Sequence, residues 1–153
     1  MVAQSERIGF VGLGSMGRSM ATSLVRKEFA VSVFDTAPAH VAALVDRGAA
    51  HASNLTALLS AADVVVTMLP NTPDVAGVVS GPGGLLETGR AGMLMLDMST
   101  IDPAASRSFG TLLAKKDIRF IDAAVGRSPA HAERGESLFM VGAEESDLKT
   151  AIV

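Results

Sequence analysis

Residues 8–17 read IGFVGLGSMG, an apolar run followed at once by the spacing G-x-G-x-x-G at Gly12, Gly14 and Gly17. A strand is predicted over 8–11 and a helix over 16–27. In such a strand–turn–helix unit the first glycine permits the tight turn, and the second lets the backbone approach a pyrophosphate. The third glycine lets helix and strand pack closely. The helix N-terminus then offers free N–H groups and a positive dipole end to phosphates. The segment predicts a dinucleotide site; the alternative is a tight turn without a ligand.

The rest of the sequence alternates short apolar runs with helical segments. Strands are predicted over 30–34, 64–69, 93–97, 120–121 and 138–141, with a weak one near 50–52. Helices are predicted from Thr36 (as N-cap, with Pro38 in the first turn) to about 47, over 54–61, from 72, over 103–116, and from 144 onward. This rhythm predicts an α/β fold, a Rossmann-type doubly wound, mainly parallel sheet with helices on both faces. The length of 153 residues fits one domain over 1–153.

Asp35 ends the second predicted strand, 18 positions after Gly17. A carboxylate at this place can accept hydrogen bonds from the adenine ribose hydroxyls. It would also repel the 2′-phosphate of NADP by about 1–4 kcal/mol at a separation of about 4 Å. The following residues 36–38 supply no Lys or Arg to hold that phosphate. The sequence therefore predicts NAD as the cofactor in preference to NADP.

Three further strand ends carry polar or turn-forming residues, at 68–71 (MLPN), 97–100 (DMST) and 122–128 (DAAVGRS). Ligands of open α/β sheets bind beyond the carboxyl ends of the strands. Taken singly, each segment is also explained by ordinary loop chemistry: a proline stop, a helix cap or a glycine turn. Together, behind a dinucleotide-binding pattern, they predict a binding site along this edge.

Composition excludes several classes of function. Hydrophobic residues make up 48% of the chain and charged residues 19%, which argues against intrinsic disorder. A net charge of −3 and the absence of Trp and Tyr argue against nucleic acid as a partner. No apolar run is long enough for a membrane span. The chain has no Cys, and its three His make no metal-binding spacing, so no metal site and a cytoplasmic setting are predicted.

Over nearly its whole length the sequence resembles the N-terminal domain of the β-hydroxyacid dehydrogenase family, which includes 3-hydroxyisobutyrate dehydrogenase and tartronate semialdehyde reductase. The resemblance is carried, in the family's order, by IGFVGLGSMGRSMATSL, VFD, DVVVTMLPNTPDV, LDMSTIDP and FIDAAVGRSPAHAERGESLFMVG. It implies that Thr100 lies near the nicotinamide. With the glycines and the strand ends, the predicted cofactor-binding residues are Gly12, Gly14, Ser15, Met16, Gly17, Asp35, Leu69, Pro70, Asn71 and Thr100.

The resemblance also implies that the segment from Asp122 binds the substrate, yet this segment departs from the family's usual pattern. Gly126-Arg127-Ser128 replaces the usual Ser-Gly-Gly, and Ala124 replaces a proline. Val-Gly-Arg-Ser is similar to the variant in sulfolactaldehyde reductase. A guanidinium can donate two hydrogen bonds to a sulfonate; the alternative is an ion pair with Glu133 or Glu136. The predicted substrate-binding residues are Ser99, Asp122, Gly126, Arg127 and Ser128, with His131 as a weaker candidate.

The family's catalytic residue is a lysine on a helix just after this domain, and the sequence ends before that motif. Lys27, Lys115, Lys116 and Lys149 are predicted to lie on solvated helix faces. No catalytic residue is therefore predicted in this chain, and the family's C-terminal all-helical domain is absent from it. The chain is expected to bind cofactor and part of a substrate without turning over alone.

The function that these observations imply is an NAD-dependent oxidoreductase that interconverts a small anionic aldehyde and its hydroxy acid by hydride transfer. Sulfolactaldehyde reductase is one candidate. A 3-hydroxyisobutyrate dehydrogenase or a succinic or tartronate semialdehyde reductase is the alternative within enzymes. A non-catalytic NAD-binding module is the alternative if the natural chain is this short. A homo-oligomer is expected for the full-length protein.

Overall fold

The computed structural model describes residues 5–143, 145 and 147. Within these residues the strands form one sheet in the order β3-β2-β1-β4-β5-β6-β7, parallel except for β7, which runs antiparallel to β6. The strands are β1 (Arg7–Val11), β2 (Ala30–Phe34), β3 (Ala50–His51), β4 (Val64–Thr67), β5 (Leu94–Asp97), β6 (Arg119–Gly126) and β7 (Leu138–Gly142). The order reverses between β1 and β4, as in a doubly wound fold. The predicted fold class is confirmed.

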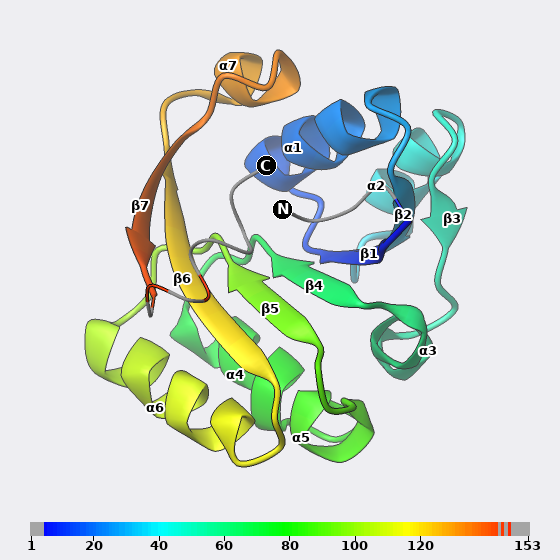
Figure 1. Cartoon of the computed structure of the whole chain (residues 1–153). Helices are drawn as coiled ribbons and strands as arrows, with labels where there is room; N and C mark the ends of the chain where they lie inside the picture. The colour runs from blue at the N-terminus through cyan, green and yellow to red at the C-terminus, as the bar shows by residue number, and fades with distance from the viewer. Residues whose placement is uncertain (1–4, 144, 146, 148–153) are drawn as a thin grey trace.

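Helices cover both faces of this sheet (Figure 1). The helices are α1 (Ser15–Arg26), α2 (Pro38–Val45), α3 (Leu55–Ala61), α4 (Thr72–Ser80), α5 (Leu85–Thr88), α6 (Pro103–Ala114) and α7 (Pro129–Glu133). In Figure 1, α1, α2 and α7 lie above the sheet, and α3 to α6 lie below it. Every residue of β4 and β5 is buried, which explains why these strands are continuous apolar runs without alternation.

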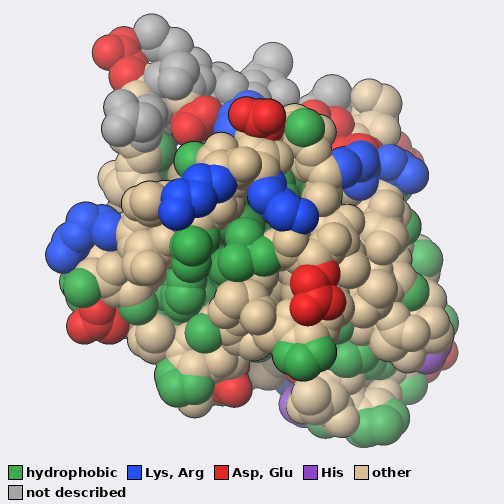
Figure 2. Space-filling view, turned by 90° about the horizontal axis from the view of Figure 1, so that it is seen from below, with side chains coloured by type: hydrophobic (Ala, Val, Ile, Leu, Met, Phe, Trp, Pro, Cys, Tyr) green, Lys and Arg blue, Asp and Glu red, His purple; other side chains and the backbone are tan. Residues whose placement is uncertain are grey.

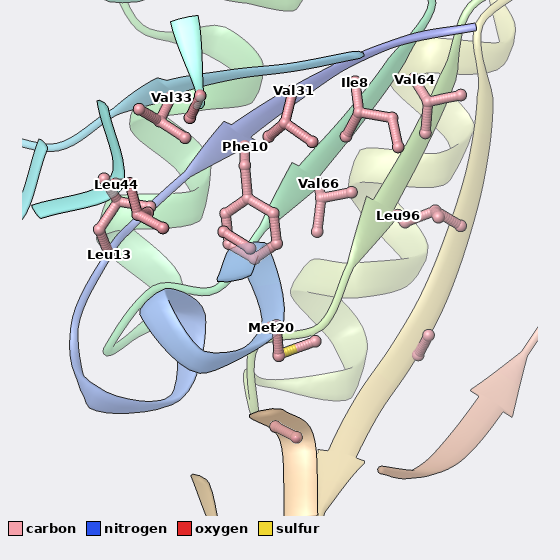
Figure 3. Close-up of a cluster of buried hydrophobic side chains, with 14 of the residues drawn as sticks. Ile8, Phe10, Leu13, Met20, Val31, Val33, Leu44, Val64, Val66 and Leu96 are labelled. Carbon is pink, nitrogen blue, oxygen red and sulfur yellow. The ribbon is translucent and has the colours of Figure 1, made fainter. Parts of the chain in front are cut away.

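Two hydrophobic clusters fix the layers, one on each face of the sheet. Phe10 of β1 is fully buried and points toward α1, with Met20 and Val66 nearby (Figure 3). The neighbouring Val65 and Met95 belong to the cluster on the opposite face. Truncating a buried aromatic such as Phe10 to alanine typically costs about 3–5 kcal/mol. This packing holds the first strand, and therefore the glycine turn that follows it, in place.

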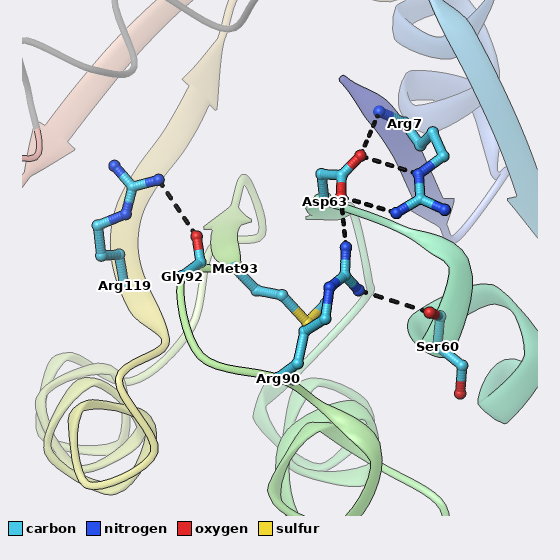
Figure 4. Close-up of polar contacts among 7 residues, drawn as sticks. All are labelled: Arg7, Ser60, Asp63, Arg90, Gly92, Met93 and Arg119. Atoms are coloured by element: carbon cyan, nitrogen blue, oxygen red, sulfur yellow. Dashed lines mark hydrogen bonds and ion pairs between the residues drawn. The ribbon is translucent and has the colours of Figure 1, made fainter. Parts of the chain in front are cut away.

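An ion-pair cluster stands at the amino edge of the sheet, away from the glycine turn. Asp63 accepts hydrogen bonds from the backbone N–H, Nε and Nη2 of Arg7, each at 2.9 Å, and also pairs with Arg90 (Figure 4). The hydrogen bonds from Arg7, with the added charge of Arg90, hold the pKa of the Asp63 carboxyl far below its ordinary value. The cluster ties the start of β1 to the segments that precede β4 and β5.

Several local predictions differ from the structure. Thr36 does not cap α2: the N-cap is Ala37, and the Asp35 carboxylate accepts the N–H of that residue. The strand predicted over 120–121 extends to Gly126, so Asp122 lies inside β6 and not in a loop. The short helices α5 and α7 were not foreseen because four or five residues carry no usable periodicity. The helix predicted from Glu144 falls mostly outside the described residues.

The surface seen from below, over the lower helices, carries Lys and Arg side chains interspersed with Asp and Glu (Figure 2).

Among the described residues, no helix combines the length and the apolar character that a membrane crossing requires.

Candidate functional site: a cleft at the carboxyl edge of the sheet

A hollow of about 700 Å³ lies at the carboxyl ends of β1, β2 and β4, where the strand order reverses. This is the place where doubly wound sheets bind their ligands. Its wall includes eight of the predicted cofactor residues: Gly12, Gly14, Ser15, Met16, Gly17, Asp35, Leu69 and Pro70. Segments far apart in the sequence therefore converge at one concave site.

The structure gives a different account of the glycine at each of the three positions of the turn. Gly12 has a φ of +93°, a conformation that side chains rarely adopt. A Cβ at Gly17 would overlap the carbonyl oxygen of Gly12, so α1 can only approach the turn without a side chain there. Gly14 has an ordinary φ of −59° and open space where a Cβ would stand. The conformation of Gly12 and the packing at Gly17 therefore explain these two glycines, whereas no protein contact requires a glycine at position 14, and its contact with a cofactor stays a prediction.

The N-terminus of α1 opens into the same hollow. Its N-cap is Gly14, no side chain caps the helix, and its first turn contains no acidic residue. The first N–H groups of this 12-residue helix are those of Ser15, Met16 and Gly17, which line the hollow, and the first turn has no carboxylate that competes for them. Unpaired N–H groups and the dipole of the helix favour phosphate at this position. The residues present fit the diphosphate of a dinucleotide.

Asp35, at the end of β2, is bound to the glycine turn itself. Its Oδ2 accepts the backbone N–H of Leu13 at 2.6 Å, and its Oδ1 accepts the N–H of Ala37 at 2.7 Å. Each carboxylate oxygen keeps a further lone pair, so these bonds leave room for ribose hydroxyls. The predicted contact with the cofactor stays a prediction. The role of Asp35 in holding the turn was not foreseen.

The charge of Asp35 is stabilised within the site. Burial opposes ionisation of the carboxyl, but the backbone hydrogen bonds from Ala37 and Leu13, with a contribution from His40, lower its pKa below the ordinary value. His40 Nδ1 lies 3.4 Å from Asp35 Oδ1. Among the described residues, no Lys or Arg lines this hollow. The end of the hollow near β2 is therefore suited to hydroxyl groups and hostile to an added phosphate.

Two predicted cofactor residues are not on this wall. Asn71 is the N-cap of α4, where its side chain accepts the N–H of Asp74 at 3.0 Å. Thr100 is exposed in the segment after β5. Their predicted contacts with the cofactor stay predictions. By contrast, α4 contributes Asp74 and Gly77 to the wall, which was not predicted.

The predicted substrate residues lie on two neighbouring strands and the loop that follows. Ser99 is fully buried, and its hydroxyl accepts the N–H of Leu69 at 2.9 Å. Asp122 stands opposite Asp97 in the β5–β6 register, and its Oδ2 accepts the hydroxyl of Ser106 on α6 at 2.6 Å. Both side chains thus have structural partners. Their contact with a substrate stays a prediction.

Arg127 follows β6 in a strained conformation, with a φ of +71°. Its Nη1 donates to the backbone carbonyl of Glu136 at 3.1 Å, whereas the carboxylate of Glu136 pairs with Arg134. The guanidinium is exposed and bridges the loop on either side of α7. Arg127 thus contacts Glu136 through its backbone carbonyl, and its charge adds to that of Arg134 in lowering the pKa of the Glu136 carboxyl, but no ion pair with Glu133 or Glu136 is formed among the described residues.

The rest of this loop is bound to α7. Ser128, the N-cap of α7, has its hydroxyl 2.8 Å from Nδ1 of His131. Gly126 ends β6, opposite Leu138 in the register with β7. The predicted substrate loop is therefore a connected polar segment at the far end of β6.

The described lysines stand away from this edge. Lys27 and Lys115 are the C-caps of α1 and α6, and Lys116 follows at once; all three are exposed. Both helices begin at the carboxyl edge and run back, so their C-terminal ends lie at the amino edge. The prediction of solvated helix ends is confirmed for these three, while Lys149 lies outside the described residues.

A second hollow of about 370 Å³ lies on the α1 face and is lined mainly by apolar side chains. Phe139 and Val141 of the exposed edge strand β7 contribute to its wall, as does Met98. None of the predicted cofactor or substrate residues lines it. The polar cleft beside the glycine turn is therefore the candidate functional site.

Comparison with known proteins agrees with this assignment. Residues 7–152 match the family model of the NAD binding domain of 6-phosphogluconate dehydrogenase. The chain is 39% identical over 143 residues to 2-(hydroxymethyl)glutarate dehydrogenase of Eubacterium barkeri, covering 94% of this chain and 48% of that protein. It is 33% identical over 150 residues to the human mitochondrial 3-hydroxyisobutyrate dehydrogenase, covering 98% and 45%.

Solved structures agree as well. The 3-hydroxyisobutyrate dehydrogenase of Mycobacterium tuberculosis, solved with L-serine, superposes with a TM-score of 0.89 at 32% identity, over 95% of this chain and 49% of that one. The chain therefore spans about half the length of the relatives that it matches.

Proposed function

This chain belongs to the family of the NAD-binding domain of 6-phosphogluconate dehydrogenase, and we propose that it is the cofactor-binding half of an NAD-dependent dehydrogenase of small β-hydroxy acids. The observation that carries the proposal is the cleft at the strand reversal, where the glycine turn, the uncapped start of α1 and the Asp35 carboxylate meet. The nicotinamide ring of NAD would accept the hydride or return it. This chain binds and orients the cofactor.

The roles divide along the cleft. The N–H groups at the start of α1 hold the diphosphate beside Gly14, where no side chain intervenes. Asp35 accepts the adenine ribose hydroxyls and repels a 2′-phosphate, so NAD is preferred to NADP. Leu69 and Pro70 line the cleft beside the glycine turn. The segments that carry Asn71 and Thr100 lie at the nicotinamide end.

The substrate is a small hydroxy acid or the corresponding aldehyde, with an anionic group bound near the end of β6. The loop from Gly126 to Ser128 supplies the polar groups, and Arg127 supplies the positive charge. The matched relatives are named for carboxylic acids, 2-(hydroxymethyl)glutarate and 3-hydroxyisobutyrate, which supports a carboxylate. Arg127 in place of the usual glycine supports a sulfonate such as sulfolactaldehyde, because a guanidinium can donate to two sulfonate oxygens.

The proton-transfer group is proposed to lie outside these 153 residues. The exposed lysines at the amino edge cannot reach the cleft, and the matched relatives are about twice as long. A helical C-terminal domain, a homo-oligomeric assembly and a cytoplasmic location are part of the same proposal. The 153-residue chain alone is expected to bind NADH without turnover.

An assay of the whole protein tests this function. NAD+ reduction is followed with 3-hydroxyisobutyrate, L-serine and 2-(hydroxymethyl)glutarate, and NADH oxidation with succinic semialdehyde and sulfolactaldehyde. The proposal expects turnover of at least one of these five compounds. The aldehyde with the higher kcat/KM shows whether the anionic group of the substrate is a carboxylate or a sulfonate. NADH binding without turnover of any member would instead favour a non-catalytic NAD-binding module.

A further inference from the structure

Asp97, the last residue of β5, is a fully buried carboxyl group for which the proposed function has no use. Its Oδ1 accepts the hydroxyl of Thr67, at the end of β4, at 2.8 Å, and the backbone N–H of Ser99 at 3.1 Å. Its Oδ2 has no hydrogen-bond partner among the residues that the structure describes. Burying a carboxyl group in this way is costly, so a purely apolar residue would pack more cheaply. Its presence calls for a reason.

The hydrogen bonds of Asp97 lead directly to the wall of the cleft. Ser99, held through its N–H by Asp97, uses its own hydroxyl to accept the N–H of Leu69. Leu69 lines the cofactor cleft, and Thr67, the last residue of β4, lies two residues before it. A single carboxyl group therefore joins the ends of β4 and β5 next to the segment after β4 that lines the cleft.

We propose that Asp97 is a positioning residue for the dinucleotide: through Thr67 and Ser99 it fixes the backbone at Leu69, one wall of the cofactor cleft. This inference rests on the proposed function, since it assigns a role within the same cleft. Asp97 touches no part of the cleft itself, because it is fully buried and absent from the wall. It acts only through its two partners.

The surroundings of the Asp97 carboxyl act on its pKa in opposite directions. Burial raises the pKa of the Asp97 carboxyl, the hydrogen bonds from Ser99 and Thr67 oppose the rise, and the carboxylate of Asp122 adds to it. Asp122 stands opposite Asp97 in the β5–β6 register. A like charge nearby disfavours ionisation of the Asp97 carboxyl. An asparagine could accept the same two hydrogen bonds on its oxygen and needs no charge.

NADH affinity in a small set of variants tests the role. Asp97→Ala removes the acceptor of both bonds and is expected to weaken NADH binding about tenfold, which corresponds to about the net contribution of one hydrogen bond. Ser99→Ala, which removes the acceptor of the Leu69 N–H, should have a similar effect. Thr67→Val should weaken binding about threefold, since Asp97 keeps one bond. Asp97→Asn should bind NADH almost as tightly as the unmodified protein.

A matched control separates positioning from general stability. Met93, just before β5 and buried at the other end of the strand, lies far from the cleft. Met93→Ala should lower Tm at least as much as Asp97→Ala, yet leave the Kd for NADH unchanged. The double variant Asp97→Ala/Ser99→Ala should bind NADH as tightly as whichever single variant has the lower NADH affinity. Both changes break the same chain of hydrogen bonds from Asp97 through Ser99 to Leu69, so their effects should not add.

Several outcomes would overturn the inference. These are an unchanged Kd in folded Asp97→Ala, an equal rise in Kd in Met93→Ala, and strictly additive losses in the double variant. An Asp97→Asn protein that binds NADH as poorly as Asp97→Ala would also overturn it, because asparagine keeps an oxygen that can accept both hydrogen bonds. If Asp97→Ala does not fold, Ser99→Ala and Thr67→Val decide. Failure of the unmodified protein to bind NADH would instead refute the proposed function.

Discussion

The carboxylate of Asp35 accepts the backbone N–H of Leu13 at 2.6 Å, so the residue at the end of β2 holds the middle of the glycine turn after β1. One side chain thereby links the two features from which the sequence predicts a dinucleotide site. The bond fixes the turn in the shape that presents the start of α1 to the cleft. It also means that a change at Asp35 affects both cofactor selectivity and the geometry of the turn.

Asp35→Ala is expected to narrow the preference for NADH over NADPH by about one decade or more, because the repulsion of the 2′-phosphate is removed. Affinity for NADH itself should also fall, because the turn loses the acceptor for Leu13. Calorimetric titration of both cofactors measures the two effects. Asp74→Asn, which removes a charge on the α4 side of the same cleft, should leave the ratio of the two affinities unchanged.

Gly14→Ala should weaken NADH binding, whereas Gly17→Ala should destabilise the fold. A methyl group at Gly14 meets open space, so the free energy of unfolding should change by less than about 1 kcal/mol. The same methyl group keeps the diphosphate away from α1, and the Kd for NADH should rise about tenfold or more. Gly17→Ala forces overlap with the Gly12 carbonyl and should destabilise the fold by about 1–3 kcal/mol or more. Thermal unfolding and NADH titration of both variants provide the check. Equal loss of stability in the two would contradict the ligand-based reason for Gly14.

The sequence predicted the architecture because its signals are local and repeated. The buried runs of β4 and β5 are apolar up to their last residue, and the glycine pattern stands between a predicted strand and a predicted helix. The features that were missed are long-range or very short. The bond between Asp35 and Leu13 spans 22 positions, the Thr67–Asp97–Ser99 network joins two strands, and α7 has only five residues. No pattern within a short window carries such pairings.

The substrate loop shows a different limit. The composition of 126–128 indicates an anion, but the positive φ of Arg127 and its bond to the carbonyl of Glu136 depend on how β7 returns beside β6. The sequence shows which polar groups this loop contains. Which of them already form hydrogen bonds within the protein depends on how the chain folds back beside β6.

Removal of the Asp63 charge should destabilise the protein in a pH-dependent way. The pKa of this carboxyl is lowered on folding, so its ion pairs contribute stability above the unfolded-state pKa of about 3.9 and lose it as the pH falls toward the lowered value. Asp63→Asn should lower the free energy of unfolding by about 1 kcal/mol at neutral pH, since the site is partly exposed and screened. The difference in the free energy of unfolding between Asp63→Asn and the unmodified protein should become smaller as the pH falls and as the salt concentration rises. Asp46→Asn, at an exposed position after α2, is the charge-matched control. A deficit that does not depend on pH would contradict the ion-pair explanation.

Arg127→Ala should reduce kcat/KM of the whole enzyme for an anionic aldehyde by about two decades, because a bidentate charge-assisted contact is lost. NADH affinity should stay the same, since Arg127 does not line the cofactor cleft. Arg134→Ala, which removes the neighbouring ion pair with Glu136, should leave both quantities unaltered. If kcat/KM for Arg127→Ala matches that of the unmodified enzyme, the guanidinium only bridges the loop around α7.

Calorimetric titration of the unmodified protein with NADH and with NADPH tests the central claim most directly. A cleft built from the glycine turn, the start of α1 and the Asp35 carboxylate should bind NADH with one site per chain, and at least about ten times more tightly than NADPH. Absence of NADH binding, or equal affinity for the two cofactors, would contradict it.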